Sequence, residues 1–169
     1  MNKLIKSIID EIDQKLECVK MNFEDNSWRE NIPPEPGWYL IKTNTPIDVL
    51  RSVGQPKFKA HINIPDTIKN TSRLQDLGIA ITQSGSSDYV VYSGEAGNLK
   101  ARAREHECGH PKTFCLGLTN YATLHQHRWT FCYVALSRCK VFSNGDKLLR
   151  LAVEQAWRAK NGWPILCKK

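Results

Sequence analysis

Arg102 and His106 are the residues in this sequence whose types and spacing most directly suggest chemistry. Asn98 can cap a helix that begins at Leu99 and carries both side chains on one stripe with Ala103. Side chains four residues apart on a helix project from the same face, so the arginine and the histidine can both reach one phosphate group. There His106 would accept a proton or donate a hydrogen bond to the phosphate. The alternative is that both are ordinary residues at the boundary of an apolar stripe.

The elements that would position this pair begin with the predicted strands. A proline-rich stretch at 31–37 cannot continue a helix, and it leads into an apolar run at 38–41 that predicts a strand. Apolar residues alternate with polar ones at 58–64, and short apolar runs occupy 78–81 and 89–92, so three further strands are predicted. A later strand is predicted at 129–135, where large side chains alternate.

Helices are predicted at both ends of the chain. Apolar residues at helical spacing give an amphipathic first helix over roughly residues 2–20. A last helix would follow Asp146 as its N-cap and stop before Gly162 and Pro164, with a buried stripe of Leu148, Leu149, Ala152, Val153 and Ala156. Helices and strands interleave without strict βαβ alternation. We therefore predict an α+β fold with a small central, mostly antiparallel sheet flanked by helices.

The charge of the chain favours a polyanionic partner. The net charge is +7 and the isoelectric point is near 9.2. Each Lys or Arg that is laid on a phosphate releases a condensed counterion, so nucleic acid is the economical expectation. Many basic proteins bind no nucleic acid, and charge informs association rather than fold.

The cysteines and the amino end bear on the cellular compartment. Six cysteines at scattered positions are expected to be reduced, mostly packed thiols rather than a disulfide framework. The first twenty residues have acids inside their apolar stretch and no small-residue cleavage site, which is unlike a secretory signal. We therefore expect a cytoplasmic protein with no membrane partner.

Two short segments carry a resemblance to a known family. PGWYLIK at 36–42 contains Gly37, Trp38 and Tyr39, and VVYSGEAGNLKARAREH at 90–106 contains the second tripeptide, Tyr92, Ser93 and Gly94. After that tripeptide, Asn-Leu, Arg and His follow at the spacing of the GIY-YIG nuclease family, which this chain resembles. The residues at those positions are Asn98, Leu99, Arg102 and His106. VEQAW at 153–157 is similar to part of the last family helix.

The resemblance implies a metal-dependent DNA endonuclease, of the restriction type for a free-standing domain of this length. In the family, tyrosines orient or deprotonate the attacking water, an arginine braces the phosphate, and one glutamate holds a single Mg²⁺ or Mn²⁺. These roles would fall to Tyr39, Tyr92, Arg102 and Glu154, with His106 completing the catalytic set. Phosphodiester hydrolysis needs such parts, and a lone carboxylate suits Mg²⁺ because the ion keeps several waters and takes phosphate oxygens as ligands.

Each of these residues also has a purely structural interpretation. Tyrosines in strands are usually core aromatics. Glu154 lies opposite the predicted apolar stripe, between Arg150 and Arg158, so a solvated ladder of salt bridges would explain it equally well. Weaker candidates for the metal ligand are Glu95, Glu105 and Glu107.

Tyr39 and Tyr92 are further apart than the two family tripeptides usually are, so an insertion is expected at about 44–86 in the hairpin. It would hold strands of its own, inside a nuclease domain at 31–169 that follows an N-terminal helical arm at 1–30. The insertion would either grip DNA or act as a stabilising cover. The residues expected to contact DNA are Lys57, Lys59, Lys69, Arg104 and Arg128, and further basic candidates are His61, Arg73, His125 and His127.

Cys167 stands where the family usually has an asparagine. This departure leaves open a nucleic-acid-binding protein with a decayed site, and a repair or mobile-element nuclease is a third interpretation. Four residues at short spacing could instead hold Zn²⁺, although they lack a paired spacing: His106, Cys108, His110 and Cys115. A cut through both strands of double-stranded DNA by one small site favours a homodimer.

Overall fold

A four-stranded antiparallel sheet is the centre of the protein. The computed structural model describes residues 3–83, 85, 87–139 and 147–168. The strands are β1 (Glu17–Lys20), β2 (Gly37–Thr43), β4 (Tyr89–Ala96) and β5 (Trp129–Ala135). They lie in the order β1-β5-β2-β4, and each neighbouring pair is antiparallel. The predicted α+β class with a central antiparallel sheet is confirmed.

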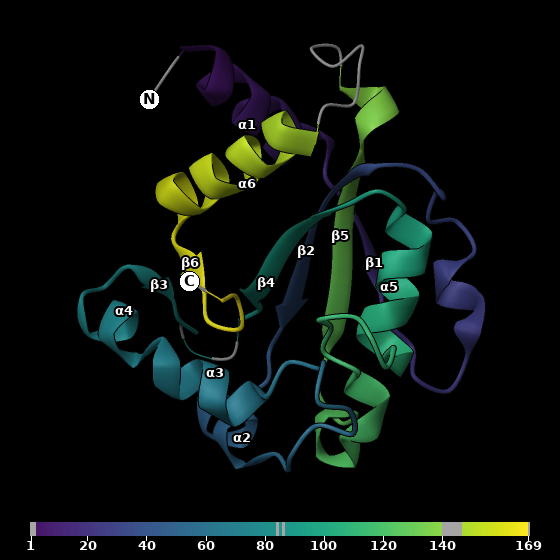
Figure 1. Cartoon of the computed structure of the whole chain (residues 1–169), viewed down its shortest axis with the longest axis vertical. Coiled ribbons are helices and arrows are strands. Elements are labelled where there is room, and N and C mark those ends of the chain that lie inside the picture. The colour runs from purple at the N-terminus through teal and green to yellow at the C-terminus, as the bar shows by residue number, and fades with distance from the viewer. Residues whose placement is uncertain (1–2, 84, 86, 140–146, 169) are drawn as a thin grey trace.

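Helices cover both faces of this sheet. α1 (Lys3–Lys15) and α6 (Lys147–Asn161) lie side by side on one face, and α5 (Leu99–Cys108) lies on the other (Figure 1). Side chains of a strand point alternately to the two faces, so β2 contributes to both cores. Trp38 and Leu40 pack with the α1 and α6 side chains, whereas Tyr39 and Ile41 pack with those of α5.

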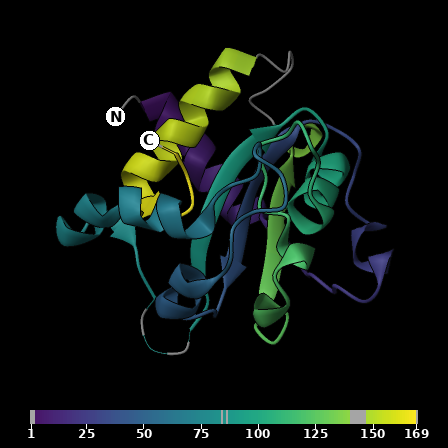
Figure 2. The ribbon, with the colours of Figure 1, turned by 60° about the horizontal axis from the view of Figure 1, so that its bottom comes forward.

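The segment between β2 and β4 contains three short helices and one short strand. These are α2 (Ile47–Ser52), α3 (Ile64–Asn70), α4 (Ser72–Asp76) and β3 (Ala80–Ile81). β2 and β4 pair directly with each other, so this segment is a long connection within one hairpin. β3 pairs in parallel with β6 (Trp163–Pro164), which ties the connection to the C-terminal segment (Figure 2).

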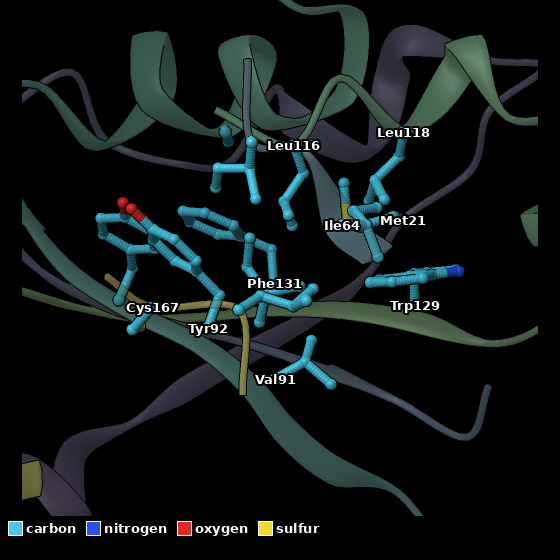
Figure 3. Close-up of a cluster of buried hydrophobic side chains, with 14 of the residues drawn as sticks. Met21, Ile64, Val91, Tyr92, Leu116, Leu118, Trp129, Phe131 and Cys167 are labelled. Atoms are coloured by element: carbon cyan, nitrogen blue, oxygen red, sulfur yellow. The ribbon is translucent and has the colours of Figure 1, made fainter. Parts of the chain in front are cut away.

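The core on the α5 side extends from the sheet into this connection and the C-terminal segment. Figure 3 shows Tyr92 and Cys167 at one end of the cluster and Trp129 at the other, with Phe131 and Leu116 between them. Short 3₁₀ helices lie in other connections of the described chain: η1 (Asn26–Arg29), η2 (Leu118–Asn120), η3 (Ala122–Leu124) and η4 (Leu136–Arg138). The polar residues described below therefore lie at an edge of a largely apolar core.

The first helix is shorter than predicted. It ends at Lys15, and residues 17–20 form β1 at the edge of the sheet, so the prediction of helix up to residue 20 is wrong. The helical periodicity is misleading here because Val19 fits both the apolar spacing of the first helix and the alternation of a strand. Pairing with β5 gives these residues hydrogen bonds that a continued helix would have had to supply locally.

The predicted strand at 58–64 is also wrong. Residues 57–61 form bends and turns, and α3 begins at Ile64. Asn63 caps this helix by accepting a hydrogen bond from the Asp66 amide, and Pro65 occupies the first turn, where it needs no amide donor. Ile62, just before the cap, and Ile64, the first residue of the helix, are both buried without forming a strand.

The buried face of the last helix overlaps the predicted one only in part. Its buried residues are Arg150, Val153, Trp157 and Arg158, whereas Leu148 is 76% exposed. Of the predicted stripe, Val153 is buried and Leu149 and Ala156 are half-buried against the core, whereas Ala152 is exposed like Leu148. The two arginines are buried because each finds a carboxylate or backbone partner. Gly162 follows the helix with a φ of +104°, as a terminating glycine should. The predicted N-cap, Asp146, lies outside the described residues.

A disulfide joins Cys18 of β1 to Cys132 of β5. The expectation of six reduced thiols is therefore wrong for this pair. The two residues are partners in the β1–β5 register, which a helix over residues 17–20 would not have allowed. The remaining cysteines, Cys108, Cys115, Cys139 and Cys167, are free.

Within the described part of the chain, no helix is long and apolar enough to cross a membrane.

Candidate active site

Tyr39 lies at the centre of a buried polar cluster between β2, β4 and α5. Its hydroxyl oxygen accepts a hydrogen bond from Arg102 Nε at 2.9 Å and is 3.0 Å from His106 Nε2. The ring of Tyr92 stacks beside that of Tyr39, with centroids 6.0 Å apart, and lies 4.8 Å from the ring of His106. Four residues predicted as catalytic thus contact one another: Tyr39, Tyr92, Arg102 and His106.

The start of α5 sets the direction of Arg102 and His106. As predicted, Asn98 is the N-cap, and its side chain accepts a hydrogen bond from the Ala101 amide at 2.8 Å. Leu99 and Ala103, fully buried, fix the same face of the helix on the sheet. Because residues three and four apart share a face, this anchoring turns both functional side chains inward.

Gly37 and Gly94 allow the strands to approach closely enough to form the cluster. Gly94 is the cross-strand partner of Tyr39, and a Cβ there would lie 2.6 Å from the Tyr39 hydroxyl oxygen. A Cβ at Gly37 would lie 2.2 Å from the Val134 carbonyl oxygen. Any side chain at either position would therefore displace a neighbour, which gives both tripeptide glycines a physical role.

Arg102 is held by partners on every side. Its Nη1 pairs with the Glu105 carboxylate at 2.8 Å, and its Nη2 donates to the Phe114 carbonyl oxygen at 2.7 Å and to the Tyr92 hydroxyl at 3.4 Å. Burial lowers the pKa of Arg102, but Tyr39, Tyr92 and Glu105 more than offset this effect and raise it. The guanidinium is therefore charged, and an incoming phosphate would have to replace the Phe114 carbonyl.

His106 is fully buried and neutral. The Leu116 amide donates to its Nδ1 at 3.3 Å, so Nε2 carries the proton and donates it to the Tyr39 hydroxyl oxygen. Burial, reinforced by the nearby Arg102 charge, holds the pKa of His106 well below its usual value. In this arrangement His106 orients Tyr39 rather than removing a proton from water.

The two tyrosine hydroxyls keep their protons in this arrangement. Burial raises the pKa of Tyr39 well above its usual value, against the opposing charge of Arg102. Burial also raises the pKa of Tyr92, to about 12, again opposed by Arg102. Both hydroxyls can orient a water through hydrogen bonds, but neither is poised to deprotonate one.

Glu154 lies across the edge of the sheet from this cluster, on α6. Its carboxylate forms an ion pair with Arg158, and the exposed fractions of the two side chains are 10% and 8%. The predicted solvated ladder is therefore wrong, because Arg158 is buried and Arg150 pairs instead with Glu95 of β4 at 2.9 Å. Burial raises the pKa of Glu154, and Arg158 opposes the shift.

A small crevice of about 20 Å³ lies between the sheet and the helices α1 and α6. Glu154, Tyr39, Ser93 and Gly94 are among the residues that line it, and its surface is almost entirely apolar. Glu154 and Tyr39 thus both border this crevice.

Cys167 contacts both Arg158 and Ser93. Its Sγ accepts hydrogen bonds from the Ser93 amide at 3.3 Å and from Arg158 Nη2 at 3.4 Å. The C-terminal segment is held over β4 because the Leu166 amide donates to the Val91 carbonyl at 2.9 Å. The residue that departs from the family pattern is therefore part of the Glu154 surroundings.

The residues predicted to bind DNA lie on the surface rather than in the cluster. Lys57, Lys59 and Lys69 are exposed in the connection between β2 and β4. Arg104 is exposed on the outer face of α5. Arg128 is exposed and pairs with Asp88, to which its Nη2 donates at 2.7 Å. Further basic residues in these regions are His61, which is buried, and Arg73, His125 and His127.

The alternative zinc cluster does not assemble. His106 contacts Tyr39 and Leu116, the Cys108 thiol lies against Glu107, and His110 contacts Thr113. Across the described ranges, no group of three His, Cys, Asp or Glu side chains is arranged to hold a metal ion. A metal held by Glu154 would therefore depend on water and substrate oxygens for its other ligands.

Three residues of these surroundings are not predicted from the sequence. Sequence patterns indicate Arg158 only as a surface partner of Glu154, and Ser93 only as part of a tripeptide. No sequence pattern indicates Phe114. Helical spacing predicts the Glu154–Arg158 pair, but the anchoring of Arg158 depends on contacts from β4 and the C-terminal segment. The Phe114 contact is made through a backbone carbonyl, which any residue type could supply.

Comparison with protein-family models, with curated proteins and with solved structures finds no match for this chain.

Proposed function

We propose that this protein is a metal-dependent endonuclease of the GIY-YIG type, which hydrolyses phosphodiester bonds in double-stranded DNA. The observation that carries the proposal is the contact of one half-buried arginine, Arg102, with the hydroxyls of both tripeptide tyrosines. Tyr39 is far from Tyr92 and Arg102 in the sequence, and each of the three occupies its position in the family pattern. Aromatic packing alone would not explain a guanidinium among these side chains, because withdrawing a charge from water costs free energy.

Arg102 is the residue best suited to bind the scissile phosphate. Its guanidinium remains charged and its side chain is 15% exposed, with Phe114 contributing a carbonyl that a phosphate oxygen can replace. Guanidinium groups bind phosphates through parallel hydrogen bonds. A donor directed at the charge that develops on the phosphate contributes to catalysis because it is already in place.

The tyrosines would orient the attacking water. Tyr39 accepts hydrogen bonds from Arg102 and His106, so its own proton is left to donate to a neighbouring oxygen. His106, neutral and fully buried, keeps the Tyr39 hydroxyl in one position. This geometry supports an orienting role for Tyr39. It does not favour deprotonation of the water by either tyrosine.

Glu154 would hold the divalent ion. The donor that fits Mg²⁺ or Mn²⁺ is the single carboxylate of Glu154, which has Arg158 on one of its oxygens. When bound there, such an ion would polarise the phosphate and neutralise the leaving oxygen. The chain's own contribution is to hold the Glu154 carboxylate beside β4, where Glu154 and Gly94 line the same crevice.

A restriction-type enzyme is the form of this function that we propose first, acting as a homodimer because both strands must be cut. We propose a cytoplasmic location as well, because that is where the DNA substrate would be met. The cysteines no longer support it, since a disulfide such as Cys18–Cys132 is more usual in oxidising compartments. The anchoring of Arg158 by Cys167 favours a second candidate, a protein that binds DNA without cutting it.

Cleavage of plasmid DNA tests the proposal. Supercoiled plasmid incubated with the purified protein and Mg²⁺ or Mn²⁺ should yield discrete linear fragments, with no product when a chelator is present. Sequencing the ends would identify the site and the cut positions. Random nicks would indicate a repair or mobile-element nuclease, and salt-sensitive binding without any cut would support the second candidate.

A further inference from the structure

Arg158 is anchored more firmly than a simple partner of Glu154 would be. Its Nε donates to Ser93 Oγ and its Nη2 to the Ser93 carbonyl oxygen, each at 2.9 Å. The Cys167 Sγ accepts a further hydrogen bond from Nη2, and the guanidinium lies 4.9 Å from the ring centroid of Trp163. Contacts from α6, β4 and the C-terminal segment thus fix one guanidinium beside one carboxylate.

This arrangement places a cation at the carboxylate that would otherwise receive a metal ion. Two positive charges on neighbouring sites of one carboxylate repel each other, and the repulsion is strong where water is largely excluded. The 10% and 8% exposed fractions of Glu154 and Arg158 show that little solvent screens the pair. A divalent ion can therefore gain full access to Glu154 only if Arg158 is displaced.

We propose that Arg158 is a positioning residue that competes with the divalent ion for Glu154 and keeps metal binding weak in the protein without DNA. The inference rests on the proposed function in one respect, because it takes Glu154 as the metal ligand. Cys167 belongs to the same device: by accepting a hydrogen bond from Arg158, it holds the guanidinium on the carboxylate. The departure from asparagine at this position thereby acquires a role in metal affinity.

Direct titration with Mn²⁺ alone, followed by the electron paramagnetic resonance signal of the free ion, tests the proposal without any cleavage assay. Arg158→Gln should bind Mn²⁺ at least about tenfold more tightly than the natural protein, because a charge next to the ion is removed. Glu154→Gln combined with Arg158→Gln should abolish the gain. Lys160→Gln is the matched control, since it removes a positive charge from the same helix, two residues away. Lys160 pairs with Asp10 and Asp13 rather than with Glu154.

A milder variant keeps the proposal testable if Arg158→Gln does not fold. Cys167→Ala retains Arg158 and removes one of its anchors, so Mn²⁺ affinity should rise by about two- to fivefold, less than removal of the charge would give. Thermal melting identifies which variants are folded. Equal Mn²⁺ affinity in the natural protein and in every folded variant would overturn the proposal.

The two proposals fail separately. If the natural protein cuts DNA with Mg²⁺ but Arg158→Gln leaves Mn²⁺ affinity unchanged, the nuclease stands and the competition is refuted. If no form of the protein cuts DNA but Arg158→Gln raises Mn²⁺ affinity through Glu154, the competition stands and the nuclease is refuted. A gain of similar size in Lys160→Gln would refute the competition, since overall charge would then explain it.

Discussion

Two arginines on opposite sides of the sheet, Arg102 half-buried and Arg158 buried, differ in the surroundings of their charge. Arg102, on α5, contacts two phenol hydroxyls and a backbone carbonyl, and its carboxylate partner Glu105 lies at the more exposed end. Arg158, on α6, has the buried carboxylate of Glu154 as a partner. Each arginine has a carboxylate partner, but Glu105 is 27% exposed and Glu154 only 10%, so water screens the Arg102 ion pair more and leaves more of its charge available to an anion. The α5 side is therefore suited to bind phosphate, and the α6 side to control a cation.

Removing the α5 arginine should have the largest effect on cleavage. We expect Arg102→Ala to lower the cleavage rate by about 10²- to 10³-fold, because the variant has no preorganised donor for the phosphate. The rate should be measured in single turnover with Mg²⁺. Lys100→Ala, which removes a half-buried lysine two residues earlier on the same helix, is the control and should cut normally. Equal rates for Arg102→Ala and the natural protein would remove the arginine from the site.

Changing the α6 carboxylate should separate cleavage from binding. We expect Glu154→Gln to lower divalent-dependent cleavage by roughly 10²-fold, since the charge that offsets the ion is removed while the shape is kept. DNA binding, measured by fluorescence anisotropy, should be retained or slightly tighter because repulsion between the carboxylate and phosphate disappears. Parallel loss of binding and cleavage would instead assign Glu154 to the fold.

The two tyrosines should differ from each other. Tyr39→Phe leaves Arg102 Nε and His106 Nε2 without their shared acceptor, so we expect a stability loss of about 1–3 kcal/mol together with reduced cleavage. Tyr92→Phe removes a longer hydrogen bond of 3.4 Å and should cost less stability while still lowering cleavage. Thermal melting and cleavage rates on both variants check this order. Unchanged cleavage in both folded variants would favour a core role for the rings.

The smallest effect is expected from the exposed lysines of the long connection. Reversing the charge of Lys57, Lys59 and Lys69 should weaken DNA binding and make it less dependent on salt, by a slope of about 0.9 for each phosphate that is no longer neutralised. Cleavage at saturating DNA should be nearly unchanged, because the partners of Arg102 and Arg158 stay in place. Lys6→Glu on α1 is the control, and binding unaffected by the reversals would make the connection a structural cover.

The α5 side of this comparison could be predicted from the sequence because its signals are local. Asn98 is a capping residue, Arg102 and His106 share a helix face, and β2 and β4 contain recognisable apolar runs. The direct pairing of β2 with β4 follows from treating the long connection as part of a hairpin. Spacing within one element is sufficient for the cap, the shared face and the strands.

The α6 side could not be predicted because it depends on contacts between distant elements. The buried face of α6 includes arginines whose burial is offset by Ser93, Glu95 and Cys167, and no helical period reveals those partners. The strand at 17–20 and the helix at 64–70 escape prediction for a related reason. In each, an apolar pattern fits two structures, and tertiary pairing or a cap decides between them.

The disulfide between Cys18 and Cys132 also closes the chain into a covalent ring with two tails. Tyr39, Tyr92, Arg102 and His106 belong to the ring, whereas Glu154, Arg158 and Cys167 belong to the C-terminal tail. A single protease cut in the connection between β2 and β4 would open the ring without dividing the molecule. The nicked protein should migrate as one band in a non-reducing gel and as two bands after reduction, so limited proteolysis can probe the lysine-bearing connection while Arg102 and Arg158 stay in one molecule.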